Sequence, residues 1–399
     1  MSQDARKFWT TWLAVSLAAI LLLSALPGCR KKAAIQQPAP VPAKEARVAA
    51  EPRIRVLLDE RFDSGRVLGA RQAESLRFQI VGSHVFLLPE GSDDGGDALV
   101  DTGFRLMPKK DLLEYQGKLY RGYLDVFVNP YGVAVLVNDL PLEEYLQGVL
   151  PLELPPSTYD RFEALKAQAV AARTFALKER GRYADQGFDL FADQRSQVYG
   201  GASREHPVTN RAVAETRGVI VAFEGKPIVA MYCSTCGGLT ESFSQVFRGG
   251  DFSYLRAGIP CPDESSPYRE WTAEVRAEEI LSGLRSRGLD PGPLQRLTIS
   301  RRTTAGRVAE LRLVGEREEI RLEGNDLRTV LGLRSTWILS VEEERNEAGR
   351  LRRVRIRGRG WGHGVGLCQF GALELAHRGY EWKRILAHYY PGTEDVQWY

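Results

Sequence analysis

One carboxylate in the chain stands in a setting that suits acid–base chemistry. Glu153 lies in the segment VLPLELPP, between Pro151 and the pair Pro155 and Pro156. Prolines have no backbone N–H and restrict the residues before them, so we expect Glu153 in a loop. Loops that are held by rigid elements often carry function. The sequence therefore predicts an acid at the edge of a cleft.

An alanine-rich helix is expected directly after this turn. Asp160 can cap the first backbone amides, and Glu163, three positions on, can return the bond as a capping box. Six alanines follow within residues 164–176, and such small side chains suit close packing, so we expect a buried helix. Lys166 and Arg173 share one face of it. Both need either carboxylate partners or a polar substrate, and the sequence leaves the two alternatives open.

Two further segments combine glycines with polar side chains. GRGWGHGVGLCQFGA has glycines around His363, and these allow the backbone to approach another group closely. His377 and His388 do not stand at zinc-like spacing from it, so we do not expect a histidine-based metal site. In AMYCSTCGGLTESF, Ser234 precedes a Gly-Gly turn. Without an identifiable base, its hydroxyl suits hydrogen bonding to a sugar or to the acid better than nucleophilic attack.

Together these segments resemble the SpoIID/LytB domain family, which includes stage II sporulation protein D and the amidase enhancers. The resemblance runs from about residue 53 to residue 399 and rests on EYLQGVLPLELP, EALKAQAVAARTFAL, QVYGG, STCGG and GWGHGVGLCQFGA. It implies cleavage of peptidoglycan glycan strands from which stem peptides have been removed, by a lytic-transglycosylase reaction. Glu153 falls on the family's catalytic glutamate. The matching motifs offer as groove-lining candidates Lys166, Gln168, Arg173, Gln197, Tyr199, Ser234, Gly237, Gly238, His363 and Gln369.

The reaction that the resemblance implies needs only one carboxylate. The muramyl 6-hydroxyl attacks its own anomeric carbon, so no second acid has to position a water molecule. Glu153 would protonate the leaving oxygen and then accept the proton of that hydroxyl, unlike the paired carboxylates of most glycosidases. Its apolar neighbours Leu152 and Leu154 favour the protonated form. Tyr199 and Trp361 are candidates either to stack on sugars or to fill the core.

Two other functional classes stay open, and no cofactor is expected. The same groove could bind glycan without cutting it and activate a partner amidase, or it could serve as a structural anchor on denuded glycan. Some family members carry a zinc site between the alanine-rich helix and the QVY segment. This chain has no histidine or cysteine between Lys178 and Tyr199. We therefore expect no metal at that place.

The first cysteine predicts export and a lipid anchor. Cys29 follows an apolar run and the residues LPG, which resemble a bacterial lipobox, and basic residues precede the run. We expect a lipoprotein of the cell envelope that faces the periplasm or the cell exterior. An uncleaved membrane anchor is the alternative, although the run is short for a stable span.

The other four cysteines are an even number, as disulfides in an oxidising compartment require. We favour a bridge between Cys236 and Cys261, because the turn before Pro262 can return its loop to STCGG. Cys233 and Cys368 could pair or remain buried thiols. The rival is a zinc site on Cys233, Cys236 and Cys261.

The chain as a whole predicts an α+β protein in several parts. Short alternating apolar runs indicate a β-rich N-terminal lobe, and helix-like and strand-like segments mix in an inserted accessory α/β subdomain. The expected parts are a signal (1–29), a flexible tether (30–52), the β-rich lobe (53–137), the catalytic α+β core with the buried helix (138–270), the accessory subdomain (271–357) and the segment completing the core (358–399). The net charge of +3 gives no sign of nucleic-acid binding. The basic cluster RRVRIRGRG fits a half-buried strand better than a site for acidic polymers.

Overall fold

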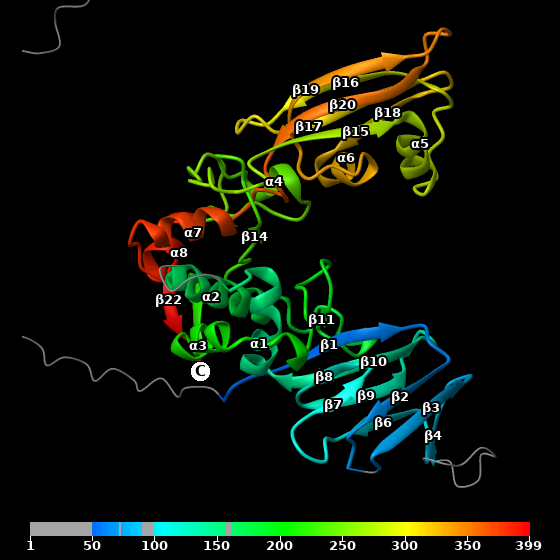
Figure 1. The fold of residues 1–399 in the computed structure, drawn as a ribbon, viewed down its shortest axis with the longest axis vertical. Coiled ribbons are helices and arrows are strands. Elements are labelled where there is room, and N and C mark those ends of the chain that lie inside the picture. Colours follow the sequence, from blue (N-terminus) through cyan, green and yellow to red (C-terminus); the bar gives the residue numbers. More distant parts are fainter. Residues whose placement is uncertain (1–49, 72, 90–98, 157–160) are drawn as a thin grey trace, which may run out of the picture. The chain divides into compact units, whose positions relative to one another are not determined.

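The computed structural model describes residues 50–71, 73–89, 99–156 and 161–399. These residues mix helices with several sheets, so the expected α+β class is confirmed (Figure 1). None of the helices in these ranges is long and apolar enough to cross a membrane. The expected signal and tether, the lipid-attachment candidate Cys29 and the helix cap Asp160 lie outside the described residues.

The N-terminal region is rich in strands, as predicted. One sheet holds β11 (Leu190–Phe191), β1 (Arg53–Glu60), β10 (Ala134–Pro141), β9 (Tyr123–Val128) and β6 (Gly103–Leu106). The other holds β5 (Leu99–Asp101), β4 (His84–Pro89), β3 (Ser75–Val81), β2 (Ser64–Leu68), β7 (Leu113–Tyr115) and β8 (Lys118–Tyr120). β10 is central in its sheet and buried along almost its whole length. It runs directly into the first helix, so the sheet sets where that helix begins.

The first helix ends at the candidate acid, and this corrects the expected loop. α1 (Leu142–Glu153) contains Pro151 in its last turn. A proline there removes one backbone hydrogen bond, which costs less near a helix end than in the middle. Leu146, Val149 and Leu150 are fully buried on the same helix. Their packing outweighs the local effect of the proline, since most helical stability in proteins comes from such tertiary contacts.

The alanine-rich helix is buried, as predicted. α2 (Phe162–Glu179) has all six of its alanines fully buried. Small side chains let other elements approach its axis closely, and α2 contacts elements from both ends of the core. These neighbours are α1, α3 (Pro207–Glu215), β12 (Val219–Phe223), β13 (Lys226–Pro227), α7 (Gln369–His377) and α8 (Trp382–Tyr389).

Short elements complete this core. β22 (Glu394–Gln397), near the C-terminus, pairs with β12 in the sheet β13-β12-β22. β14 (Tyr232–Cys233) pairs in parallel with β21 (Leu367–Cys368). The remaining pieces are η2 (Ala184–Gln186), η3 (Ala202–Arg204) and α4 (Phe243–Val246). Residues late in the chain therefore close the same core that α1 and α2 begin.

The accessory segment has a hydrophobic cluster of its own, which runs from Trp271 to Ile356. Its two sheets are β15 (Glu270–Arg276), β20 (Leu351–Arg359) and β19 (Trp337–Arg345), and β16 (Leu294–Arg302), β17 (Val308–Gly315) and β18 (Glu319–Glu323). The helices α5 (Ala277–Arg285) and α6 (Gly324–Val330) pack against these strands (Figure 1). All the pairs are antiparallel, whereas an α/β unit would have parallel strands.

The basic cluster forms a half-buried strand, as the sequence indicated. In β20, Val354 and Ile356 are fully buried while Arg353 and Arg355 point outward. Arg355 pairs with Glu274 on the neighbouring strand at 2.7 Å. The alternation of arginine and aliphatic residues is therefore explained by one face packed on the core and one face in water.

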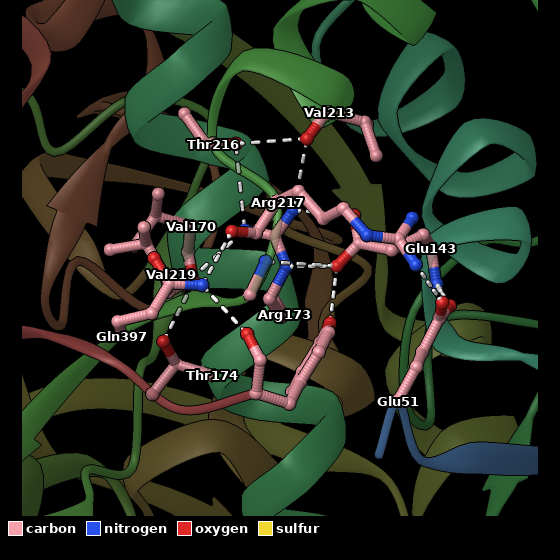
Figure 2. Close-up of polar contacts among 12 residues, drawn as sticks. Glu51, Glu143, Val170, Arg173, Thr174, Val213, Thr216, Arg217, Val219 and Gln397 are labelled. Atoms are coloured by element: carbon pink, nitrogen blue, oxygen red, sulfur yellow. Dashed lines mark hydrogen bonds and ion pairs between the residues drawn. The ribbon is translucent and has the colours of Figure 1, made fainter. Parts of the chain in front are cut away.

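A buried ion pair joins α2 to α1 (Figure 2). Arg173 donates from Nε to Oε1 of Glu143 at 2.7 Å and from Nη2 to Oε2 at 2.8 Å. It also donates to the carbonyl of Val219, at the start of β12, at 3.0 Å. The hydroxyl of Tyr399 donates to the same glutamate. Two helices, a strand and Tyr399 thus meet at one pair of charges. Figure 2 labels Glu143, Arg173 and Val219 and marks their contacts with dashed lines.

We predict that Arg173→Met lowers the free energy of unfolding by about 3–5 kcal/mol, because Glu143 is then left buried and unpaired. Lys178→Met, an exposed position on the same helix, is the matched control and should change stability by less than about 0.5 kcal/mol. Urea unfolding of the full-length protein measures both. Equal losses in the two variants would contradict a stabilising role for the pair. Adding Glu143→Met to Arg173→Met should recover part of the loss, since no unpaired charge then remains.

Candidate functional site

Glu153 is the last residue of α1, and three separate segments hold its carboxylate. The backbone N–H of Val198 donates to Oε1 at 2.8 Å. The side chains of Tyr232, in β14, and Gln369, the first residue of α7, also hydrogen-bond to it. All three partners are uncharged, so none of them fixes the ionised form as a cation would.

Burial sets the protonation preference of this acid. The pKa of Glu153 is raised because the carboxylate loses hydration, and the hydrogen bonds from Val198, Tyr232 and Gln369 oppose that rise only in part. The side chain is half-buried rather than sealed. The result is a carboxyl group that holds its proton more strongly than an exposed glutamate and keeps contact with the outside.

An open hollow in the surface adjoins the acid. It has a volume of about 550 Å³ and is lined by Ala192, Asp193, Gln194, Arg195 and Val198. Val198 also supplies the amide that binds Glu153, so the hollow and the acid share this one residue. Asp193 and Arg195 form an ion pair at 2.7 Å on its wall. These residues were not predicted from the sequence; the available signal was their position, with residues 192–195 just before the QVYGG segment and Val198 inside it.

The segments around Glu153 converge because of strand pairing. Parallel pairing places Tyr232 of β14 beside Leu367 of β21, and β21 leads directly into α7, which begins with Gln369. Ser234 lies just beyond β14, and its carbonyl accepts a bond from the N–H of Phe370 at 3.1 Å. Of the predicted groove residues, Gln369 is thus brought to the acid, and Ser234 is bonded to the residue that follows Gln369. Tyr232 joins them, although the sequence analysis did not name it.

Gln197 and Tyr199 lie behind the site, not in the groove where they were expected. Gln197 is fully buried; it donates to the hydroxyl of Tyr232 at 2.9 Å and accepts from Tyr145 at 3.2 Å. Its role is to orient the tyrosine that contacts the acid. Tyr199 is buried, with its hydroxyl donating to Asn138 at 2.7 Å. It fills the core, the second of the two roles that the sequence left open.

The predicted polar residues of α2 also turn away from a groove. Lys166 pairs with Glu163 at 2.5 Å, and Arg173 is fully buried against Glu143. Of the two alternatives that the sequence left open, the structure shows carboxylate partners for both residues, and a direct role in lining a groove is not supported for Arg173. Gln168 is fully buried, and within the described residues neither polar atom of its side chain has a hydrogen-bond partner. The structure therefore also corrects the predicted groove-lining role of Gln168.

His363 holds the glycine-rich segment in place. Its Nδ1 accepts from the N–H of Val365 at 3.0 Å, and the ring also bonds to the backbone of Tyr232. Burial, together with nearby Arg307, lowers its pKa to about 3. The imidazole is therefore neutral at physiological pH and occupied by backbone groups. It suits a supporting role better than a sugar contact.

Close backbone contact accounts for the two glycines of STCGG. Gly237 and Gly238 have φ angles of +85° and +122°. Residues other than glycine rarely adopt such positive angles. A Cβ atom on Gly237 would lie 3.0 Å from Cβ of Arg359.

Trp361, the other aromatic candidate for stacking, is 37% exposed and stands edge-on to Tyr268 with ring centres 4.1 Å apart. It keeps a surface that a sugar could reach.

The cysteines depart from the predicted bridge. The loop does return to STCGG, because the N–H of Cys261 donates to the carbonyl of Gly238 at 2.8 Å. Cys233, Cys236, Cys261 and Cys368 are nevertheless all free thiols in the described part of the chain. The sulfur atoms of Cys236, Cys261 and Cys368 lie within 4.8 Å of one another. A group of three therefore stands where the sequence predicted a disulfide pair.

Known proteins are similar to this chain over segments that build this site. A family model described as Stage II sporulation protein matches residues 131–223. The stage II sporulation protein D of Bacillus amyloliquefaciens is 33% identical over 276 residues, which is 65% of this chain and 75% of that protein. The chain belongs to the SpoIID/LytB family. An uncharacterised protein of Brachyspira hyodysenteriae is 32% identical over 287 residues, covering 72% of this SpoIID/LytB chain and 73% of the relative.

Two further matches concern this SpoIID/LytB protein. A model described as a domain of unknown function (DUF8618) matches residues 256–366, which include the accessory segment. The amidase enhancer of Bacillus subtilis is 28% identical over 299 residues, which is 62% of this chain and 40% of that protein. The family match at 131–223 contains Glu153 and Val198.

We predict that Glu153→Gln becomes more stable relative to the wild type as the pH rises from about 4.5 to about 7. The folded protein has a raised pKa at Glu153, above the unfolded value of about 4.3. The stability that this group contributes is present below the unfolded pKa and is lost as the pH rises toward the folded pKa. Glutamine keeps an acceptor for Val198 and cannot ionise. Urea unfolding at several pH values measures the difference.

Glu347→Gln is the control for this experiment, because its side chain is exposed in the turn between β19 and β20. The stability difference between this variant and the wild type should stay constant over the same range of pH. A constant difference for Glu153→Gln as well would mean that Glu153 ionises as freely in the folded protein as in the unfolded chain.

Proposed function

We propose that this protein is a lytic transglycosylase that cleaves peptidoglycan glycan strands lacking stem peptides, with Glu153 as its acid and base. The observation that carries the proposal is the half-buried Glu153 carboxyl group, whose pKa is raised and whose hydrogen-bond partners are all uncharged. Val198, whose N–H binds this carboxyl group, also lines an open hollow. A general acid needs a proton near neutral pH and access to the leaving oxygen, and this setting favours both.

The reaction proceeds through a single carboxyl group. Protonated Glu153 gives its proton to the glycosidic oxygen as the bond from that oxygen to the anomeric carbon breaks. The carboxylate that forms receives hydrogen bonds from Val198, Tyr232 and Gln369, which stabilise the new charge. It then takes the proton of the muramyl 6-hydroxyl as that oxygen bonds to the anomeric carbon. The products are a free sugar end and a 1,6-anhydromuramyl end, and Glu153 is protonated again.

The hollow supports a polymeric substrate. It is open and lined by polar as well as apolar residues, among them the pair Asp193 and Arg195. Hydroxyl groups of sugars can accept from the arginine and donate to the aspartate. An enclosed cavity would admit only a chain end, whereas an open hollow suits a strand that continues on both sides.

A second candidate is a non-catalytic activator of a partner N-acetylmuramoyl-L-alanine amidase. The similarity to the amidase enhancer of Bacillus subtilis favours it. In this case the same hollow binds glycan, and Glu153 serves as a hydrogen-bond acceptor. The two functions differ in one product, since only the enzyme releases anhydromuramyl ends.

We predict that Glu153→Gln lowers the release of anhydromuramyl products from peptide-free glycan by about 10²–10⁴-fold, the usual contribution of a general acid or base. The full-length protein is incubated with purified strands and the products are identified by mass spectrometry. Glu144→Gln, on the same helix and half-buried, is the matched control and should keep the wild-type rate. Glycan binding by sedimentation should be retained in both variants.

Two outcomes would contradict the enzymatic proposal. Equal product release by the wild type and by Glu153→Gln would remove Glu153 from the reaction. No product from any variant, together with retained binding and faster turnover of an added amidase, would favour the activator.

We further propose that the protein is an exported lipoprotein, anchored through Cys29, because peptidoglycan lies outside the cytoplasmic membrane. The lipobox-like LPGC sequence supports this placement. We predict that Cys29→Ser moves the protein from the membrane fraction to the soluble fraction of its host, as detected by immunoblot. Retention of this variant in the membrane fraction would instead favour an uncleaved apolar anchor.

A further inference from the structure

Three buried thiols meet at one point of the core. The sulfur atoms of Cys236, Cys261 and Cys368 lie within 4.8 Å of one another, and all three residues are buried. Cys236 belongs to the STCGG turn and Cys261 to the loop that pairs with it. Cys368 ends β21 and caps α7. Residues far apart in the sequence thus place three soft ligands together.

The donors around Cys368 suit a thiolate. The N–H of Cys236 donates to its sulfur at 3.2 Å and the N–H of Gly371 at 3.4 Å. Hydrogen bonds of this kind orient metal ligands and compensate part of their charge. The carboxylate of Asp263 also faces the group. Its Oδ2 lies 3.6 Å from the sulfur of Cys368 and accepts from the N–H of Gly237 at 2.6 Å, and its Oδ1 pairs with Arg269. It supports the surrounding loop.

An unpartnered hydroxyl lies beside the same group. Tyr389 is fully buried, and its hydroxyl has no hydrogen-bond partner among the described residues. A Cβ atom on Gly371 would lie 2.1 Å from that hydroxyl and 3.3 Å from Cβ of Cys368. A buried polar group without a partner is costly. Its position next to the thiols indicates that something polar is held there.

We propose that Cys236, Cys261 and Cys368 bind one zinc ion. Thiolates are the ligands that zinc prefers in structural sites, and binding releases the thiol protons. Such sites usually have four ligands. Cys233 is the other thiol in the described residues; its sulfur lies 3.8 Å from that of Cys236 but outside the group of three, so it would have to move toward the ion to become the fourth ligand. A disulfide between two of the three would leave the third thiol buried and unused.

The ion would hold the candidate active site in shape. Cys368 directly precedes Gln369, and Cys233 directly follows Tyr232; both of these neighbours bind Glu153. A zinc ion at this point would fix β14, β21 and the start of α7 relative to one another. The metal content can be measured without any activity assay, so this proposal stands or falls independently of the proposed function.

The test is the metal and thiol content of the full-length protein, purified without chelator from cells grown with zinc. We expect about one zinc per chain by elemental mass spectrometry, with Cys233, Cys236, Cys261 and Cys368 all reactive to a thiol reagent in denaturant plus chelator. Cys261→Ser and Cys368→Ser should each reduce the zinc to less than about a tenth of the wild-type content. Cys29→Ser, a cysteine outside the group, should keep it.

A second measurement covers variants that fail to fold. The wild-type protein is stripped of metal, reduced and loaded with cobalt(II), and we expect the thiolate-to-cobalt absorption of a tetrahedral site. Wild-type protein without metal and with fewer than four free thiols in residues 233–368 would establish a disulfide and overturn the proposal. Zinc that persists in both Cys261→Ser and Cys368→Ser would overturn it too, because the metal would then lie elsewhere.

Discussion

The buried pair of Arg173 and Glu143 is the constraint on which the core depends. Two charges removed from water cost several kcal/mol each unless every donor and acceptor is satisfied. Here β12 and Tyr399 supply hydrogen-bond partners in addition to those of the two helices. The pair is therefore stable only when elements from the middle and the end of the chain are in place together. It also fixes α1, whose far end carries Glu153 about 15 Å along the helix axis from Glu143.

Two glutamates on this one helix thus have different roles because their surroundings differ. Glu143 forms a buried ion pair with a guanidinium. Among the described residues, the donors to Glu153 are uncharged, and burial raises its pKa. The first holds the fold through its ion pair, and the second can keep a proton to use. Neither role is visible from the residue type, since both depend on which partner the fold brings within hydrogen-bond distance.

This dependence explains how much the sequence could predict. Periodicity and composition were sufficient for the strands and for the buried α2, whereas the motif predicts Glu153 as the acid and its role stays a prediction. The prediction of a loop around Glu153 was wrong. The proline signal is local, whereas the burial of Leu146 and Leu150, which stabilises the helix, is a property of the assembled core. Arg173 and Gln197 lie on the right motifs but face inward. A motif does not state which way a side chain points, and the hollow beside Val198 needs segments that only folding brings together.

The accessory segment takes part in the same construction. Arg307, at the turn between β16 and β17, is almost fully buried and donates to the carbonyl of Cys236. A Cβ atom on Gly364 would lie 2.1 Å from its guanidinium, so only glycine leaves room for the arginine there. Arg307 therefore reaches the STCGG turn and the glycine-rich segment at once. Because Cys236 precedes the insertion and Gly364 follows it, the accessory segment helps to set the distance between the two strands, β14 and β21, that deliver side chains to Glu153.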